Sequence, residues 1–175
     1  MQRKLAEILK TRLDGCRRLA VLGVGSELRG DDAAGVLVVR ELRELVSESS
    51  FRHLEFEGFE GANAPENMTG FIKSFKPTHI LLVDAADIGA AVGECQEIAV
   101  SEISEILFST HTLPMKVITD YLEQSTGAVI TILGIQPGCV DFDSAPTPEI
   151  KSGASKLSCC LYEVLKELDR CFKDS

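Results

Sequence analysis

The chain has 175 residues, of which 45% are apolar, and this is enough for one compact domain with a single core. Charged residues make up 26%, and no apolar run reaches the length of about 18 residues that a bilayer span needs, so the composition excludes disorder and membrane insertion. The net charge of −9 is uneven, because residues 1–18 carry six basic and two acidic side chains. The acidic remainder predicts no binding to nucleic acid and favours a basic or metal-loaded partner.

The six cysteines form no C-x-x-C pair and follow no apolar signal peptide, so we expect reduced thiols in a cytoplasmic protein. No cysteine stands at a predicted helix start beside a paired histidine, and the G-x-S-x-G motif of serine hydrolases is absent. Acyl-enzyme chemistry is therefore disfavoured. A monomer is the expected state.

The first residues have the pattern of an amphipathic helix. Leucine and isoleucine recur at helical spacing in residues 1–13, among basic side chains. We predict that residues 1–18 form a basic helical extension ahead of one α/β domain at residues 19–175. The helix serves either to dock the chain on an acidic partner surface or to stabilise the sheet by packing on it.

Apolar runs alternate with segments of helical periodicity in the rest of the chain. This alternation predicts a three-layer α/β/α sandwich with a mostly parallel central sheet of about five strands. The predicted strands are residues 17–25, 51–57, 79–84, 93–100 and 128–134, and the predicted helices are about 31–46, 66–75, 101–107, 114–124 and 147–170.

Three polar residues follow predicted strands. Asp32 lies a few residues beyond the first strand, Asp84 is the last residue of the third, and His111 follows the fourth. Ligands of such sheets collect beyond the carboxyl ends of the strands, so we expect the three side chains to converge. Two close carboxylates repel unless a proton or a cation lies between them, and a nearby imidazole favours a metal. These donors suit zinc, nickel, cobalt or manganese, with positions left open for water or substrate.

Each acidic residue also has an ordinary structural interpretation. Asp31 and Asp32 open a predicted helix, where carboxylates cap free amide groups, and Asp84 alone could bond a loop amide. Two other motifs fit less well. The G-V-G of residues 23–25 begins a dinucleotide fingerprint whose next glycine is replaced by Leu28. The acids also resemble the pocket of a phospho-receiver domain, but there the paired acids end the first strand directly.

Five motifs in order along the chain resemble those of the nickel-iron hydrogenase maturation endopeptidases, in the branch that serves hydrogenase 3 type large subunits. Residues 23–35 read G-V-G-S-E-L-R-G-D-D-A-A-G, which is similar to G-x-G-N-x-x-x-x-D-(D/E)-x-x-G. The resemblance extends over residues 19–170. The other four motifs are A-P-E-N at 64–67, V-D-A at 83–85, T-H-T-L-P at 110–114 and L-G-I-Q-P at 133–137.

This resemblance implies a cytoplasmic protease that removes a short C-terminal extension from a hydrogenase large-subunit precursor after nickel insertion. The family positions that match Asp32, Asp84 and His111 bind a divalent metal. The metal implied is nickel supplied by the substrate, for which zinc or cadmium could substitute. The residues predicted to line the substrate-binding loops are Gly25, Ser26, Asp31 and Gln136.

Two positions depart from the family pattern. Ser26 replaces an asparagine, and the D-G-G loop corresponds to residues 60–62, so that Glu60 or Glu57 takes the place of the loop aspartate. We predict Asp32 and Glu60 as catalytic residues. Two routes stay open: a metal-polarised carbonyl with metal-bound water, or a carboxylate such as Glu60 or Asp32 as general base. The alternative function is a non-enzymatic maturation chaperone that senses metal or binds the large subunit.

Overall fold

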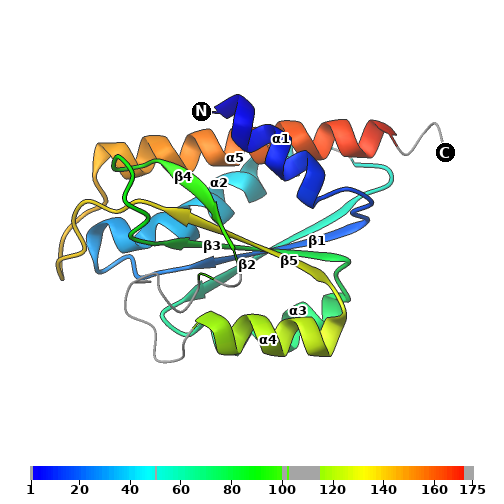
Figure 1. Cartoon of the computed structure of the whole chain (residues 1–175), viewed down its shortest axis with the longest axis horizontal. Helices are drawn as coiled ribbons and strands as arrows, with labels where there is room; N and C mark the ends of the chain where they lie inside the picture. Colours follow the sequence, from blue (N-terminus) through cyan, green and yellow to red (C-terminus); the bar gives the residue numbers. More distant parts are fainter. Residues whose placement is uncertain (1, 50, 100–101, 103–114, 172–175) are drawn as a thin grey trace.

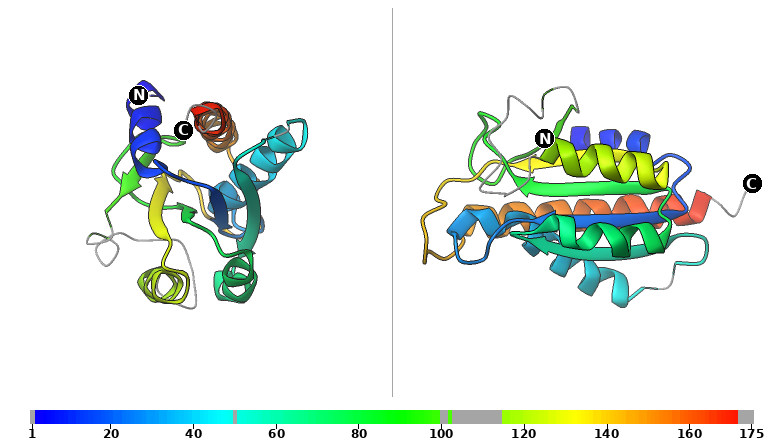
Figure 2. Two further views of the ribbon diagram at one scale, coloured as in Figure 1. Left: turned by 90° about the vertical axis from the view of Figure 1, so that its right-hand side faces the viewer. Right: turned by 90° about the horizontal axis from the view of Figure 1, so that it is seen from below.

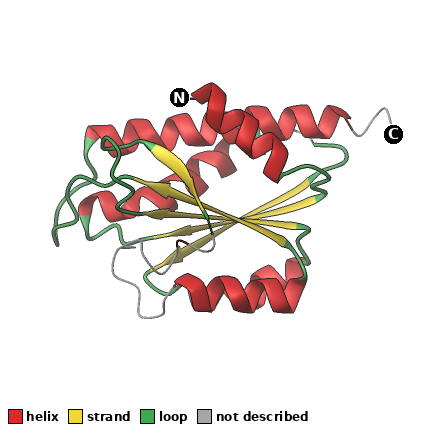
Figure 3. Cartoon of the chain, in the orientation of Figure 1, coloured by secondary structure: helices red, strands yellow, loops and turns green. Residues whose placement is uncertain are grey.

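The computed structural model describes residues 2–49, 51–99, 102 and 115–171. Five strands within them form one sheet in the order β2-β1-β3-β5-β4 (Figure 1; Figure 3). The predicted mostly parallel sheet is confirmed. The parallel strands are β1 (Arg18–Val24), β2 (Glu55–Ala62), β3 (His79–Ala85) and β5 (Val129–Ile135), and β4 (Cys95–Ile98) is an antiparallel edge strand.

Helices cover both faces of this sheet, which confirms the three-layer sandwich (Figure 2). No helix in the described part of the chain is long and apolar enough to cross a bilayer. One face carries α1 (Gln2–Arg12), α2 (Ala34–Ser47) and α5 (Pro148–Cys171), the other carries α3 (Thr69–Phe75) and α4 (Met115–Thr126), and the 3-10 helices η1 (Gly30–Ala33) and η2 (Pro65–Met68) precede α2 and α3.

The central strand β3 shows why its sequence is apolar throughout. Leu81 and Val83 belong to the core under α2 and α5, whereas Ile80 and Leu82 belong to the core over α3 and α4. A parallel strand between two helical layers is buried on both faces and loses the alternation of polar and apolar residues. The last residues of β3 are buried as well, and among them is Asp84.

Helix α1 is part of this core. Leu9 and Leu13 are buried against the helices of that face. The Lys10 ammonium also pairs with Glu167 of α5 at 2.7 Å. Exposed ion pairs of this kind contribute at most about 1 kcal/mol, so the buried leucines supply most of the attachment. The contacts favour a stabilising role for α1 over a docking role.

The strand predicted at residues 51–57 is wrong in its position, because β2 runs from Glu55 to Ala62. Glycine is depleted in strands, but Gly58 lies in β2, where it allows close packing. A Cβ added at Gly58 would lie 2.9 Å from Val39 of α2. Glu60 therefore lies in a strand that pairs with β1.

Two helix predictions also need correction. The segment from Gly30 to Ala33 is a 3-10 helix, so α2 begins at Ala34, and the helix predicted at 66–75 is divided into η2 and α3. The helix predicted at 101–107 lies outside the described residues except for Glu102.

Candidate functional site

The loop between β1 and η1 fixes Asp32. The Ser26 amide donates to Asp32 Oδ2 at 2.8 Å, and Asp32 is fully buried. Gly25 has φ +124°, and a Cβ at this position would lie 1.7 Å from the Asp32 carbonyl oxygen. Only glycine fits there. The Gly25 amide also donates to the Ala62 carbonyl at 3.0 Å, which joins the ends of β1 and β2. Gly25 and Ser26 therefore hold the Asp32 carboxylate in place.

Asp84 lies at the same end of the sheet as Asp32. A Cβ added at Gly35 would lie 2.2 Å from the Val83 carbonyl oxygen and 2.4 Å from that of Val24. The start of α2 thus fits between the ends of β3 and β1, and η1 with Asp32 lies directly before it. We call this end, where the four parallel strands finish, the carboxyl edge. It carries the buried carboxylates of Asp32 and Asp84, as expected for the ligand side of a parallel sheet.

The two carboxylates fit a divalent cation in their donor chemistry. Carboxylate oxygens from η1 and β3, with an imidazole as the third ligand, match an ion of borderline softness. His111, the predicted third ligand, lies outside the described residues, so the triad of Asp32, Asp84 and His111 stays a prediction. Among the described residues, no group of three His, Cys, Asp or Glu side chains could hold a metal ion.

Asp31 binds a distant loop instead of capping its own helix. Its Oδ2 accepts from the amides of Gly138 at 2.8 Å and Cys139 at 2.9 Å, and its Oδ1 accepts from the Thr147 amide at 2.7 Å. The interpretation of Asp31 as a local cap is therefore wrong. Burial acts to raise the pKa of Asp31, but these three amides outweigh it and lower the pKa below its usual value. Asp31 thereby fixes the loop of residues 137–147 beside η1.

We expect Asp31→Asn to lower the free energy of unfolding by about 1–3 kcal/mol at neutral pH, because a neutral amide cannot replace a carboxylate that accepts from three amides. The folded-state pKa lies below the unfolded value of about 3.9, so the carboxylate stabilises the fold above that pH. The contribution is lost as the pH falls through the folded-state pKa. Urea unfolding of both proteins across this range should show the difference shrinking below about pH 4.

The matched control is Asp120→Asn, which removes only an exposed pair with Lys116 on α4. Its unfolding free energy should stay within about 0.5 kcal/mol of the wild type. A difference between wild type and Asp31→Asn that stays constant down to the lowest pH would contradict the assigned role of Asp31.

The Gln136 side chain stabilises the loop that follows Asp84. Its Oε1 accepts from the Ile88 amide at 2.9 Å and the Ala90 amide at 3.2 Å, and its Nε2 donates to Asp87 Oδ1 at 3.2 Å. Because both the oxygen and the nitrogen of the Gln136 amide form hydrogen bonds, Gln136 fixes the loop after Asp84 at the carboxyl edge. Its contact with substrate stays a prediction.

Two arginines of α2 hold Glu60. Arg40 Nη2 lies 2.8 Å from Glu60 Oε2, and Arg43 Nη1 lies 2.6 Å from Oε1. Hydrogen bonds with Glu27 and Glu60 raise the pKa of Arg40 above its usual value. Arg40 therefore joins α2 to β2 and to the loop after β1. Sequence reasoning missed this cluster, although two arginines three residues apart on a helix share a face.

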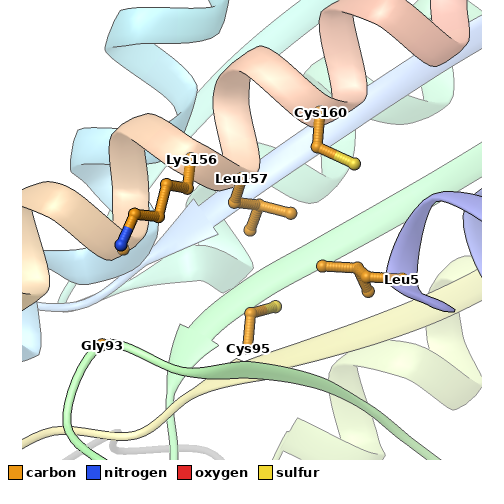
Figure 4. A pocket seen from close by; sticks show the side chains of 7 residues that line it. Leu5, Gly93, Cys95, Lys156, Leu157 and Cys160 are labelled. Atoms are coloured by element: carbon orange, nitrogen blue, oxygen red, sulfur yellow. The ribbon is translucent and has the colours of Figure 1, made fainter. Parts of the chain in front are cut away.

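All six cysteines are free thiols. Cys95 and Cys160 point into a small cavity between α1, β4 and α5, which Leu5 and Leu157 also line (Figure 4). Burial, together with the neighbouring Cys160, raises the pKa of Cys95 to about 12. A thiol that stays protonated at neutral pH is a poor nucleophile, which argues against Cys95 as a nucleophile.

The chain is similar to known proteins in sequence and in structure. Residues 36–159 match the family model for hydrogenase maturation protease. A Methanocaldococcus jannaschii protein whose name assigns it to the hydrogenase maturation proteases is 39% identical over 166 residues, which is 94% of this chain and 98% of that protein. The hydrogenase 3 maturation protease of Escherichia coli K12 is 35% identical over 132 residues, which is 75% of this chain and 80% of that protein.

A solved structure is similar over most of its length. The crystal structure of the NiFe hydrogenase maturation protease HycI from Thermococcus kodakarensis KOD1 has a TM-score of 0.77 to this chain, at 33% sequence identity. The match covers 91% of this chain and 99% of that chain.

Proposed function

The chain belongs to the hydrogenase maturation protease family, and on this premise we propose that it removes a C-terminal extension from the large-subunit precursor of a nickel-iron hydrogenase after nickel has been inserted. The observation that carries this proposal is the placement of two buried carboxylates at the carboxyl edge, Asp32 in η1 beyond the end of β1 and Asp84 at the end of β3. The six free thiols support a reducing compartment such as the cytoplasm as the place of action.

The nickel is part of the substrate in this account. Asp32, Asp84 and the predicted ligand His111 engage the nickel that the precursor already carries. The Ser26 amide fixes the Asp32 carboxylate for this contact. When the nickel is bound, the peptide bond beside it lies at the carboxyl edge. Holding two reactants in the correct geometry can lower the activation free energy by about 7–11 kcal/mol. Precursor without nickel lacks this anchor, which makes cleavage depend on metal insertion.

The ion pairs of Glu60 indicate that the two predicted catalytic carboxylates, Asp32 and Glu60, have different roles. Both Glu60 oxygens accept from guanidinium groups, of Arg40 and Arg43. A general base needs an oxygen that reaches the attacking water. We therefore assign a positioning role to Glu60, which holds α2 against β2, and keep Asp32 as the catalytic carboxylate that engages the nickel. The substrate's nickel supplies polarisation of the scissile carbonyl.

The test is incubation of the full-length chain with nickel-loaded and with nickel-free precursor, followed by mass measurement of the released C-terminal peptide. We expect release from the nickel-loaded precursor alone. Equal cutting of both precursors would reject nickel recognition. Stable binding of the nickel-loaded precursor without any release would reject the protease and support the maturation chaperone.

A further inference from the structure

Two loops at the carboxyl edge present large apolar side chains to solvent. Leu28, in the loop after β1, is 58% exposed, and Phe142, in the loop before α5, is 71% exposed. The loops are joined, because the Asp143 amide donates to the Leu28 carbonyl at 2.7 Å and the Gly30 amide donates to the Ser144 carbonyl at 3.0 Å. We call the surface formed by Leu28, Phe142 and the two acids beside Phe142 the Leu28–Phe142 rim.

The rim is acidic as well as apolar. Asp141 and Asp143 flank Phe142, and both are exposed. The Asp141 carboxylate accepts from the Cys139 thiol at 3.4 Å, and no described lysine or arginine pairs with either acid. An apolar group between two unneutralised carboxylates is complementary to an apolar segment with basic neighbours.

The loops of the rim are held in place before any partner arrives. The Asp31 carboxylate accepts from the Gly138, Cys139 and Thr147 amides, so the second loop is fixed to η1. Asp31 directly precedes Asp32, and the rim is therefore built on the same loop that positions the candidate site. A surface that is already ordered loses little conformational entropy on binding.

We propose that the Leu28–Phe142 rim binds an apolar segment of the large-subunit precursor that carries basic side chains beside it. This inference rests on the proposed function, since a protein substrate whose nickel reaches Asp32 and Asp84 must cover the adjoining loops. A second copy of this chain is a poor occupant, because two acidic rims repel each other. Binding would remove the exposed apolar surface of Leu28 and Phe142 from water, so both side chains contribute to the affinity.

The test compares the Leu28→Ser/Phe142→Ser double variant with Val129→Ser in the full-length chain. Val129 is 49% exposed but starts β5, at the opposite edge of the sheet. Cleavage of nickel-loaded precursor by the double variant should show a KM that is about 10- to 100-fold higher, as for the loss of two contact residues, with kcat unchanged. Val129→Ser should keep the wild-type KM. Unfolding curves of all variants check that each is folded.

A second variant tests the charge of the rim. Asp141→Asn/Asp143→Asn keeps the size of both side chains, and asparagine tolerates the positive φ of 62° at Asp143. It should raise KM by about 3- to 10-fold at low salt, and the difference from wild type should vanish at about 0.5 M salt.

The outcomes distinguish a failure of the rim proposal from a failure of the proposed function. A double variant with the wild-type KM, while the wild type cuts the precursor, would overturn the rim alone. An equal rise of KM in Val129→Ser would also overturn it, because the effect would not be local to the rim. Wild-type protein that neither binds nor cuts nickel-loaded precursor would overturn both proposals. If the wild type and Val129→Ser sediment as dimers and the double variant sediments as a monomer, the rim binds a second copy of this chain instead.

Discussion

Asp84→Asn should abolish processing of nickel-loaded precursor, with a loss in kcat/KM of at least about 100-fold. Asparagine keeps the shape of the side chain and one oxygen acceptor, but it removes the negative charge that attracts a divalent cation, and a neutral amide oxygen is a weaker ligand. Asp84 is fully buried at the end of β3, so the variant changes little of the exposed surface. The measurement is the rate at which the C-terminal peptide appears by mass spectrometry. Asp32→Asn should show a loss of the same size.

The control for these variants is Asp120→Asn on α4, which is one of the described carboxylates away from the carboxyl edge. It should cut at the wild-type rate. Unfolding curves should show that Asp84→Asn and Asp32→Asn remain folded. Cutting by either variant at the wild-type rate would remove that residue from the candidate site.

Gly35→Ala should lower the free energy of unfolding by about 3 kcal/mol, one of the largest effects of any single substitution in the chain. The reason is that the closely packed site has no room for an extra methyl group. The added Cβ would lie 2.2 Å from the Val83 carbonyl oxygen and 2.4 Å from that of Val24. Both neighbours are strand backbone, which cannot move without breaking the sheet. The start of α2 must then shift, and Asp32 shifts with it. Guanidinium unfolding followed by circular dichroism measures the change.

Gly70→Ala is the matched control, because Gly70 also lies in a helix but has nothing within 4 Å of its added Cβ. Alanine favours a helix over glycine by about 1 kcal/mol, so Gly70→Ala should stabilise the chain. The two substitutions should therefore change stability in opposite directions. A Gly35→Ala protein as stable as the wild type would contradict the close approach of α2 to the strand ends.

The parts of the fold that local patterns dictate could be predicted from the sequence. The continuous apolar run of β3 and the Thr147-Pro148 start of α5 depend only on neighbouring residues, and both agree with the structure. The position of β2 could not be predicted in this way. Glycine serves both turns and close packing, and only the distance from Gly58 to Val39 of α2 distinguishes the two uses.

The same distinction between local pattern and tertiary contact applies to the residues of the candidate site. Asp84 lies at the end of a strand and Asp32 follows another strand after a short loop, and these positions alone predict that both lie at the carboxyl edge. The partners of Asp31 are 107 to 116 residues away along the chain, so no local pattern could indicate them. The pairing of Glu60 with two arginines likewise depends on how α2 lies against β2. Roles that depend on tertiary contact required the structure.

The most direct test of the account is the position of a metal ion bound to the chain. Crystals soaked with cadmium, as a stand-in for the nickel of the precursor, can be examined by anomalous diffraction. We expect one strong peak coordinated by a carboxylate oxygen of Asp32, a carboxylate oxygen of Asp84 and the imidazole of His111. A peak that touches only one of these side chains, or cadmium bound solely elsewhere, would contradict a shared cation at the carboxyl edge.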